Sequence, residues 1–290
     1  MAVALAEAIH SNLISQGSWF REYLDEALYG PLDWPDLTHG AAGQGIAAIC
    51  CSQILGQPEL LGAADRCADF LIASQDSEGS WTMPAGVEGM SGARLTGFAH
   101  GAAGIVYFLS EYAARSRSHE AADAARRGAN WLLAQANISR MPGGLEWPTR
   151  EGGEDVWRWW CHGAPGIALA WLKLFERYGN PDDRQIAIRS LLSCPSEVRY
   201  NNLSQCHGLS GLGEIYLEAT KVLADEQWRL RAEYIADTLL GLARNSGHGK
   251  VWLVEDGPAA TGDLMVGCGG VIHFLLRLCT EDELSFPLLP

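Results

Sequence analysis

Residues 159–166 read WWCHGAPG, and the pattern that they contain decides the fold. A Cys-His pair precedes two glycines spaced three residues apart, and an apolar run follows over residues 167–178. Residues 204–211, SQCHGLSG, repeat this arrangement before a second apolar run. Because glycine lacks a Cβ, a G-x-x-G step lets the backbone turn tightly into a helix. We therefore expect each step to lead into a helix.

The G-x-x-G step occurs five times, which indicates an internal repeat. Its first glycines are Gly40, Gly101, Gly163, Gly208 and Gly267. A helix that is apolar nearly all round follows each step, as is typical of an element buried on several sides. The predicted ranges of these inner helices are 44–55, 105–114, 167–178, 212–223 and 271–278.

A more charged helix with one apolar face precedes each step. The predicted ranges of these outer helices are 2–27, 58–74, 119–136, 182–192 and 226–243. The alternation predicts an all-α fold: an α/α toroid (barrel) of about five helical hairpins, forming a single domain over residues 1–290. The inner-helix N-termini, with their glycine steps, should gather at one end.

Two long loops lead into glycine steps, at residues 75–97 and 137–160. Loops of this length in a compact domain are usually functional or disordered, and we interpret these as the walls of a cleft. Candidates for lining such a cleft are the loop tryptophans Trp81, Trp147, Trp157, Trp159, Trp160 and Trp252.

Composition narrows the function classes. The net charge of −14 argues against nucleic acid or an anionic membrane as a partner. No signal peptide is evident at the N-terminus, and no run of about 18 uncharged apolar residues predicts a membrane span. The eight cysteines are scattered through helical segments, which favours a reduced, cytoplasmic protein over a disulfide scaffold.

The residues just before the glycine steps carry the chemistry. The residue before the first glycine is a histidine in four of the five steps: His39, His100, His162 and His207. Cys161 and Cys206 precede two of these histidines. Thiolate and imidazole are ligands that zinc prefers, and a catalytic zinc site needs three protein ligands and one open position. The pattern predicts a metal site, and it leaves open whether His162 or His207 is the third ligand.

Four motifs resemble the lanthionine synthetase C-like family, the cyclases of lanthipeptide biosynthesis and their relatives. They are GFAHG at 97–101, WCHG at 160–163, CHG at 206–208 and LMVG at 264–267. The ending FLLRL at 274–278 is also similar, and the resemblance covers most of the chain. Family barrels usually have seven helical pairs, whereas this chain offers five.

The resemblance implies a role for six residues. Cys161, Cys206 and His207 would bind zinc, His100 would be the acid/base histidine, and Asp36 its acidic partner. A family arginine before the first zinc cysteine would correspond to Arg158, although Arg158 stands one place closer to that cysteine and Trp157 occupies the usual position.

The implied reaction is Michaelis-type addition of a peptide cysteine to dehydroalanine or dehydrobutyrine, which forms (methyl)lanthionine thioether rings. The partner would be a dehydrated precursor peptide supplied by a separate dehydratase or kinase/lyase protein, because the chain has no such domain. Two other enzymatic functions would also use zinc and a thiolate: addition of glutathione to dehydrated residues, and protein prenylation. The non-enzymatic alternative is a zinc-containing module that binds a peptide or partner.

Overall fold

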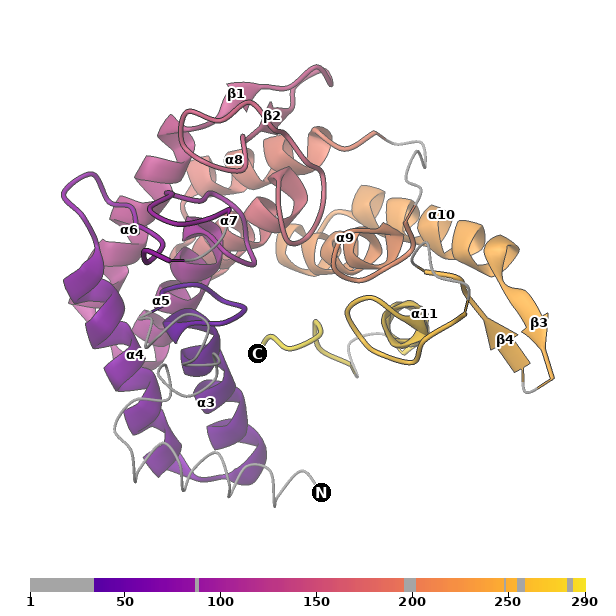
Figure 1. The fold of residues 1–290 in the computed structure, drawn as a ribbon, viewed down its shortest axis with the longest axis horizontal. Helices are drawn as coiled ribbons and strands as arrows, with labels where there is room; N and C mark the ends of the chain where they lie inside the picture. Colours follow the sequence, from indigo (N-terminus) through magenta and orange to yellow (C-terminus); the bar gives the residue numbers. More distant parts are fainter. Residues whose placement is uncertain (1–33, 87–88, 196–201, 248, 255–258, 281–283) are drawn as a thin grey trace. The chain divides into compact units, whose positions relative to one another are not determined.

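The computed structural model describes residues 34–86, 89–195, 202–247, 249–254, 259–280 and 284–290. Within these ranges it contains nine α-helices, one 3₁₀ helix and two small antiparallel sheets (Figure 1). The helix predicted over residues 2–27 lies outside the described residues. The chain divides into two compact units: unit 1 contains the described residues up to 135 with 150–153 and 288–290, and unit 2 contains 136–149 and 154–287.

The inner helices follow the five glycine steps. They are α3 (Ala41–Leu55) and α5 (Ala102–Ser116) in unit 1, and α7 (Ala164–Tyr178), α9 (Leu209–Leu223) and α11 (Cys268–Cys279) in unit 2. Each begins three residues earlier than predicted, so the predicted starts are wrong. The glycine step itself forms the first helical turn, with its first glycine at the N-cap.

The outer helices are α4 (Leu61–Ser74), α6 (His119–Ala134), α8 (Pro181–Leu192) and α10 (Glu226–Leu242), and the 3₁₀ turn η2 (Pro58–Leu60) leads into α4. Each outer helix packs against the inner helix that precedes it in the chain, as Figure 1 shows for α3 and α4. The described residues thus form four helical hairpins and a final helix, α11. None of their helices is both long enough and apolar enough to cross a membrane.

Outer and inner helices begin in different ways. Ser118, Asn180 and Asp225 cap α6, α8 and α10 by accepting a hydrogen bond from a backbone N–H in the first turn. The inner helices have no side-chain cap. In four of them the first N–H instead donates to the carbonyl seven residues earlier, over 2.8–3.1 Å: Ala41 to Trp34, Ala102 to Leu95, Leu209 to Asn202 and Cys268 to Thr261. The loop before the helix therefore satisfies amides that would otherwise lack a partner.

The second glycine of a step is required by this loop. A Cβ at Gly104 would lie 2.2 Å from the carbonyl oxygen of Phe98 and 2.9 Å from the Leu37 Cβ. Any other residue would push the loop away from the start of α5. The glycine step is therefore a packing requirement rather than a ligand-binding motif.

Neighbouring inner helices approach each other through a second glycine position. A Cβ at Gly45 of α3 would lie 2.2 Å from the Phe108 ring of α5, and one at Gly213 of α9 would lie 2.4 Å from the Phe274 ring of α11. Both phenylalanines are fully buried. The same Gly–Phe contact thus occurs once in each unit.

A buried ionic network holds α11 on α9. Glu214 is fully buried, and its two carboxylate oxygens lie 2.7 Å from His273 Nδ1 and 2.8 Å from an Arg277 guanidinium nitrogen. The Arg277 guanidinium also lies 2.6 Å from the Glu218 carboxylate. Because each charge is paired, the cost of burying it is offset.

The loops that lead into the glycine steps contain the two small sheets and several buried tryptophans. Strands β1 (Asn137–Ile138) and β2 (Leu145–Glu146) form one hairpin, and β3 (Arg244–Ser246) and β4 (Gly249–Val251) form the other. The tryptophans at 81, 147, 160 and 252 are at most 8% exposed. Trp81 and Trp252 donate their indole N–H to carbonyls of α4 and α10, so they anchor their loops.

The close approach at Gly104 predicts that Gly104→Ala lowers the free energy of unfolding by about 1–3 kcal/mol, the usual range for overpacking. Urea unfolding followed by circular dichroism measures the change. Gly62→Ala in α4 is the matched control, since no atom lies within 4 Å of its added Cβ. It should be neutral or should stabilise by up to about 1 kcal/mol. Equal effects of the two substitutions would refute the packing argument.

Candidate functional site

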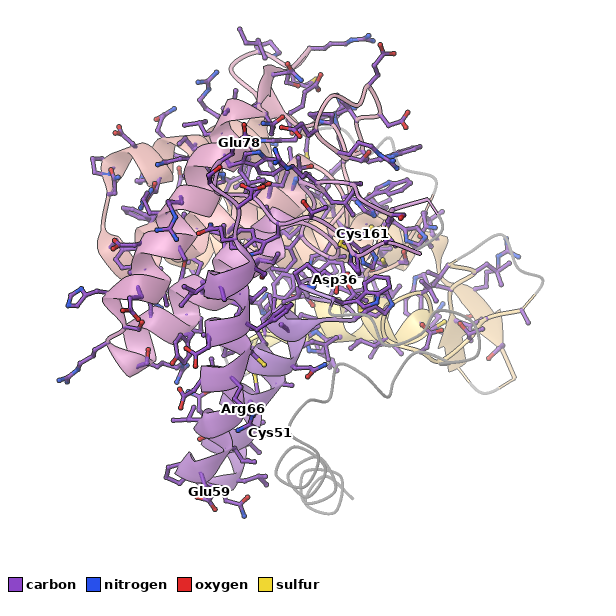
Figure 2. All side chains as sticks on the ribbon, turned by 60° about the vertical axis from the view of Figure 1, so that its left-hand side comes forward. Asp36, Cys51, Glu59, Arg66, Glu78 and Cys161 are labelled. Atoms are coloured by element: carbon purple, nitrogen blue, oxygen red, sulfur yellow. The ribbon has the colours of Figure 1, made fainter. Side chains whose placement is uncertain are left out.

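In unit 2, the structure brings together Cys161, Cys206 and His207. Their ligand atoms all lie within 4.8 Å of one another. Cys161 belongs to the loop before α7, where Figure 2 labels it, and the other two belong to the loop before α9. Cys161 is buried, whereas Cys206 and His207 are partly exposed. This is the set of three that the family resemblance implied.

Main-chain hydrogen bonds align the loops that carry these residues. The Cys161 N–H donates to the Cys206 carbonyl over 3.2 Å, and the Cys206 N–H donates to the Met265 carbonyl over 2.9 Å. These three residues occupy the same place, two before the first glycine of their steps. In unit 1, Thr38 donates to the Ala99 carbonyl over 3.1 Å at that same place. Within each unit, equivalent positions of neighbouring repeats are therefore linked by main-chain hydrogen bonds.

His162 is not part of the converging set, although His162 and His207 are equivalent in sequence. The backbone explains the difference. Gly163 has φ +114°, whereas the first glycines of the other four steps have φ between −119° and −140°. Only glycine adopts such a positive φ readily. Since the loop before α7 turns differently here, the His162 carbonyl accepts from the Trp159 N–H over 3.0 Å, and the histidine that joins the cysteines is His207.

The donor set suits a divalent metal ion. Two effects raise the pKa of the Cys161 thiol: first its hydrogen bond with Cys206, and second its burial. The protein alone therefore does not hold two adjacent thiolates. A zinc ion stabilises thiolates directly, and two sulfur atoms with one imidazole nitrogen are ligands that it accepts. The residues present therefore fit zinc. Cys268 does not join them, since its Sγ donates to the Trp252 carbonyl over 3.2 Å.

Two tryptophans lie beside the sulfur-containing cluster. The Trp159 ring lies 5.4 Å from the His207 ring, and Trp157 stacks on Trp159 with their ring centroids 4.3 Å apart. Trp157 is 43% exposed. Of the six predicted cleft tryptophans, these two offer apolar surface to a ligand, and the buried four pack within the fold.

In unit 1, Asp36 and His100 form a hydrogen-bonded pair. The Asp36 carboxylate is fully buried in the loop before α3, where Figure 2 labels it, and its Oδ2 lies 2.8 Å from His100 Nδ1. Burial would raise the pKa of Asp36, but hydrogen bonds from His100 and His39 outweigh it and hold the pKa below its usual value. The carboxylate is therefore ionised at neutral pH.

His39 accompanies this pair, and we did not assign it a role from sequence. Its backbone N–H donates to Asp36 Oδ1 over 2.7 Å, and its ring stacks on that of His100 with centroids 5.1 Å apart. The signal was present in the repeat, because His39 occupies the same position as His100 and His207.

The Arg158 guanidinium binds groups that do not belong to the cysteine cluster. Its Nε donates to the Ser193 carbonyl and one Nη to the Glu146 carboxylate, both over 3.0 Å. It thereby ties the loop before α7 to β2 and to the end of α8. A catalytic role for Arg158 stays a prediction.

The comparisons with known proteins concern the family and the fold of the chain. A family model described as "Lanthionine synthetase C-like protein" matches residues 4–290. The structure is similar to nisin cyclase, with a TM-score of 0.60 and 15% identity over 98% of this chain and 82% of that one. It is also similar to the GH76 α-mannanase BT2949 of Bacteroides thetaiotaomicron, with a TM-score of 0.63 and 13% identity over 96% and 85% of the two chains.

A third similar structure is a D-mannose isomerase, with a TM-score of 0.59 and 13% identity over 97% of this chain and 82% of that one. Nisin cyclase and the GH76 mannanase are α/α toroids, which confirms the predicted fold class. At such identities the likeness shows the fold alone, because proteins with different activities share it.

The contacts of Arg158 predict that Arg158→Met lowers the free energy of unfolding by about 1–2 kcal/mol, since the partly buried Glu146 carboxylate loses its ion-pair partner and the Ser193 carbonyl loses the Arg158 donor. Chemical denaturation measures the change, and Arg140→Met, at an exposed arginine of the same unit, is the control. Unchanged stability would show that these contacts contribute little.

Proposed function

The chain belongs to the lanthionine synthetase C-like family, and on that premise we propose that it is a zinc-dependent peptide cyclase. It would add cysteine thiols of a dehydrated peptide to dehydroalanine or dehydrobutyrine residues of the same peptide. The products would be lanthionine and methyllanthionine thioether rings. The observation that carries the proposal is the convergence of Cys161, Cys206 and His207.

Three protein ligands suit catalysis better than a purely structural role. Structural zinc sites normally have four protein ligands, whereas catalytic sites keep one position open. Zinc bound by these three residues would supply a Lewis acid that lowers the pKa of a substrate thiol and leaves it nucleophilic. His207 is steadied by the bond from its backbone N–H to the Ser204 hydroxyl, over 3.1 Å.

The reaction adds S–H across a carbon–carbon double bond. The thiol loses its proton, the sulfur bonds to Cβ, and the electron pair of the double bond moves toward the neighbouring carbonyl as an enolate. A proton delivered to Cα then restores the carbonyl. The protein must therefore supply a proton at one carbon.

His100 is the residue that we propose for this proton. Its Nδ1 is directed at the ionised Asp36, which favours the tautomer with the proton on Nδ1, and Nε2 would be the atom that exchanges a proton with substrate. Asp36 would orient the ring and stabilise it when charged. Arg158 remains a candidate for stabilising the negative charge of the enolate.

The substrate would be a dehydrated precursor peptide, made by a separate dehydratase or by a kinase/lyase protein. The exposed face of Trp157 and its stack with Trp159 favour contact with apolar peptide side chains next to the cysteine cluster. We propose a cytoplasmic location, because thiolate ligands and substrate thiols need reducing conditions.

Addition of glutathione to dehydrated residues is the second candidate, because it needs the same zinc-bound thiolate and the same proton donor. The two reactions differ in the source of the sulfur. Mass spectrometry separates them, since an intramolecular ring leaves the mass of the dehydrated peptide unchanged and glutathione addition increases it. A binding module without catalysis would give neither product.

Metal binding tests the sulfur ligands. In cobalt-substituted protein, two thiolates should give a thiolate-to-cobalt charge-transfer absorption, and Cys206→Ala should abolish it or reduce it strongly. Cys279→Ala is the matched control, because Cys279 is exposed at the end of α11. A charge-transfer band of full intensity in Cys206→Ala would exclude Cys206 as a ligand.

The acid–base step is tested by His100→Asn. We expect the thiolate-to-cobalt absorption to persist while cyclisation of a dehydrated peptide slows by about 100- to 10,000-fold, the usual contribution of general acid–base catalysis. Alkylation of unreacted thiols followed by mass spectrometry measures the rate. The control is His119→Asn, at an exposed histidine that begins α6. Wild-type rates in the His100 variant would remove this residue from the mechanism.

A further inference from the structure

Three donor atoms converge in unit 1 without any cysteine. Asp36 Oδ2 lies 2.8 Å from His100 Nδ1 and 3.7 Å from His39 Nδ1, and the three ligand atoms lie within 4.8 Å of one another. Both imidazoles thus direct the same nitrogen at the same carboxylate oxygen. Only the shorter of the two separations is a hydrogen bond.

These separations fit a shared cation. Zinc binds histidine nitrogen and carboxylate oxygen at about 2.0–2.2 Å, so two such ligands of one ion lie about 3.0–3.5 Å apart. The two observed separations bracket that range. The two histidine nitrogens lie within 4.8 Å of each other, so the histidines would have to close on the ion for both nitrogens and the oxygen to bind it.

The arrangement is held in place by contacts that do not depend on a cation. The Leu37 and Thr38 amides and the Thr38 hydroxyl all donate to the Ala99 carbonyl over 3.1 Å, which ties together the loops before α3 and α5. Asp36 Oδ1 accepts the His39 N–H, so the carboxylate cannot rotate and Oδ2 faces the two rings. Trp34, itself buried with Met83 and Leu95, packs against the His39 ring at 5.0 Å between centroids.

We propose that Asp36, His39 and His100 form a second divalent-cation site, different in ligand class from the cysteine cluster. Two histidines and one carboxylate suit zinc and the other first-row divalent ions, and three protein ligands leave positions open for water. The His39 side chain is 43% exposed, which gives an ion a route to the buried carboxylate.

The site has a consequence that rests on the proposed function. A cation bound to His100 Nδ1 replaces the proton that this nitrogen shares with Asp36. The histidine is then a metal ligand and no longer the Asp36-oriented donor of a proton. Occupancy of the second site would therefore inhibit cyclisation, whereas occupancy of the cysteine cluster would support it.

Cobalt titration of the full chain, freed of metal with a chelator, tests the second site. We expect the wild type to bind two equivalents, of which only one produces the thiolate-to-cobalt absorption. His39→Phe keeps an aromatic ring against Trp34 and His100 but removes the nitrogen ligand, and it should bind one equivalent, with the thiolate absorption intact. His119→Phe is the matched control and should bind two. Binding of one equivalent by the wild type, or of two by His39→Phe, would overturn the proposal.

Two further measurements make the outcome unambiguous. Cys206→Ala should lose the thiolate absorption and still bind cobalt through the second site, so failure of the cysteine site and failure of this one are told apart. If circular dichroism shows that His39→Phe does not fold, a cobalt-soaked crystal of the wild type decides the matter. An anomalous-scattering peak among Asp36, His39 and His100 supports the proposal, and its absence refutes it.

Discussion

In four of the five inner helices, a backbone hydrogen bond runs from the first residue of the helix to the carbonyl seven residues earlier, and the arrangement of loop and helix depends on it. It replaces a side-chain cap, and it folds the preceding loop against the first helical turn so closely that the step must be glycine. The same geometry places the residue before the first glycine next to the N-terminus of each of these helices. The candidate functional residues thereby lie at a few loop positions, whereas the helices pack against one another.

The repeat made most of the fold predictable. The outer helices α4, α6, α8 and α10 start and end within two residues of their predicted bounds, apart from the short 3₁₀ turn before α4, because a charged face and an apolar face mark them clearly. The predicted starts of the inner helices are wrong, because the glycine step forms the first helical turn and does not precede the helix.

The cysteine cluster was predictable from the Cys-His pairs. The pattern alone did not choose between His162 and His207, because the choice depends on the backbone angle at Gly163; only the family resemblance implied His207. The pairing of Asp36 with His100 depends on two loops that are distant in sequence, and it too was implied by the resemblance alone.

The helical framework indicates less about activity than the side chains of the loops do. Similar helical frameworks occur in a cyclase, a mannanase and a sugar isomerase, so the packed helices are compatible with unrelated substrates. In this chain, the candidate functional side chains lie at the positions just before the glycine steps. Sulfur gathers in unit 2 and nitrogen with a carboxylate in unit 1, so successive repeats of one framework present two different donor chemistries.

The spacing of the two cysteines along the sequence implies that a bound metal ion would also stabilise the fold. Cys161 and Cys206 stand 45 residues apart in the sequence, on either side of the hairpin formed by α7 and α8. A cation that held both would close this segment into a loop, as a disulfide does. For a loop of that length, the chain-entropy model assigns about 4 kcal/mol to such a cross-link, through the restriction of the unfolded chain. The same ion would then serve as a reactant-binding centre and as a reversible cross-link, so that loss of metal would lower the free energy of unfolding as well as stop the chemistry.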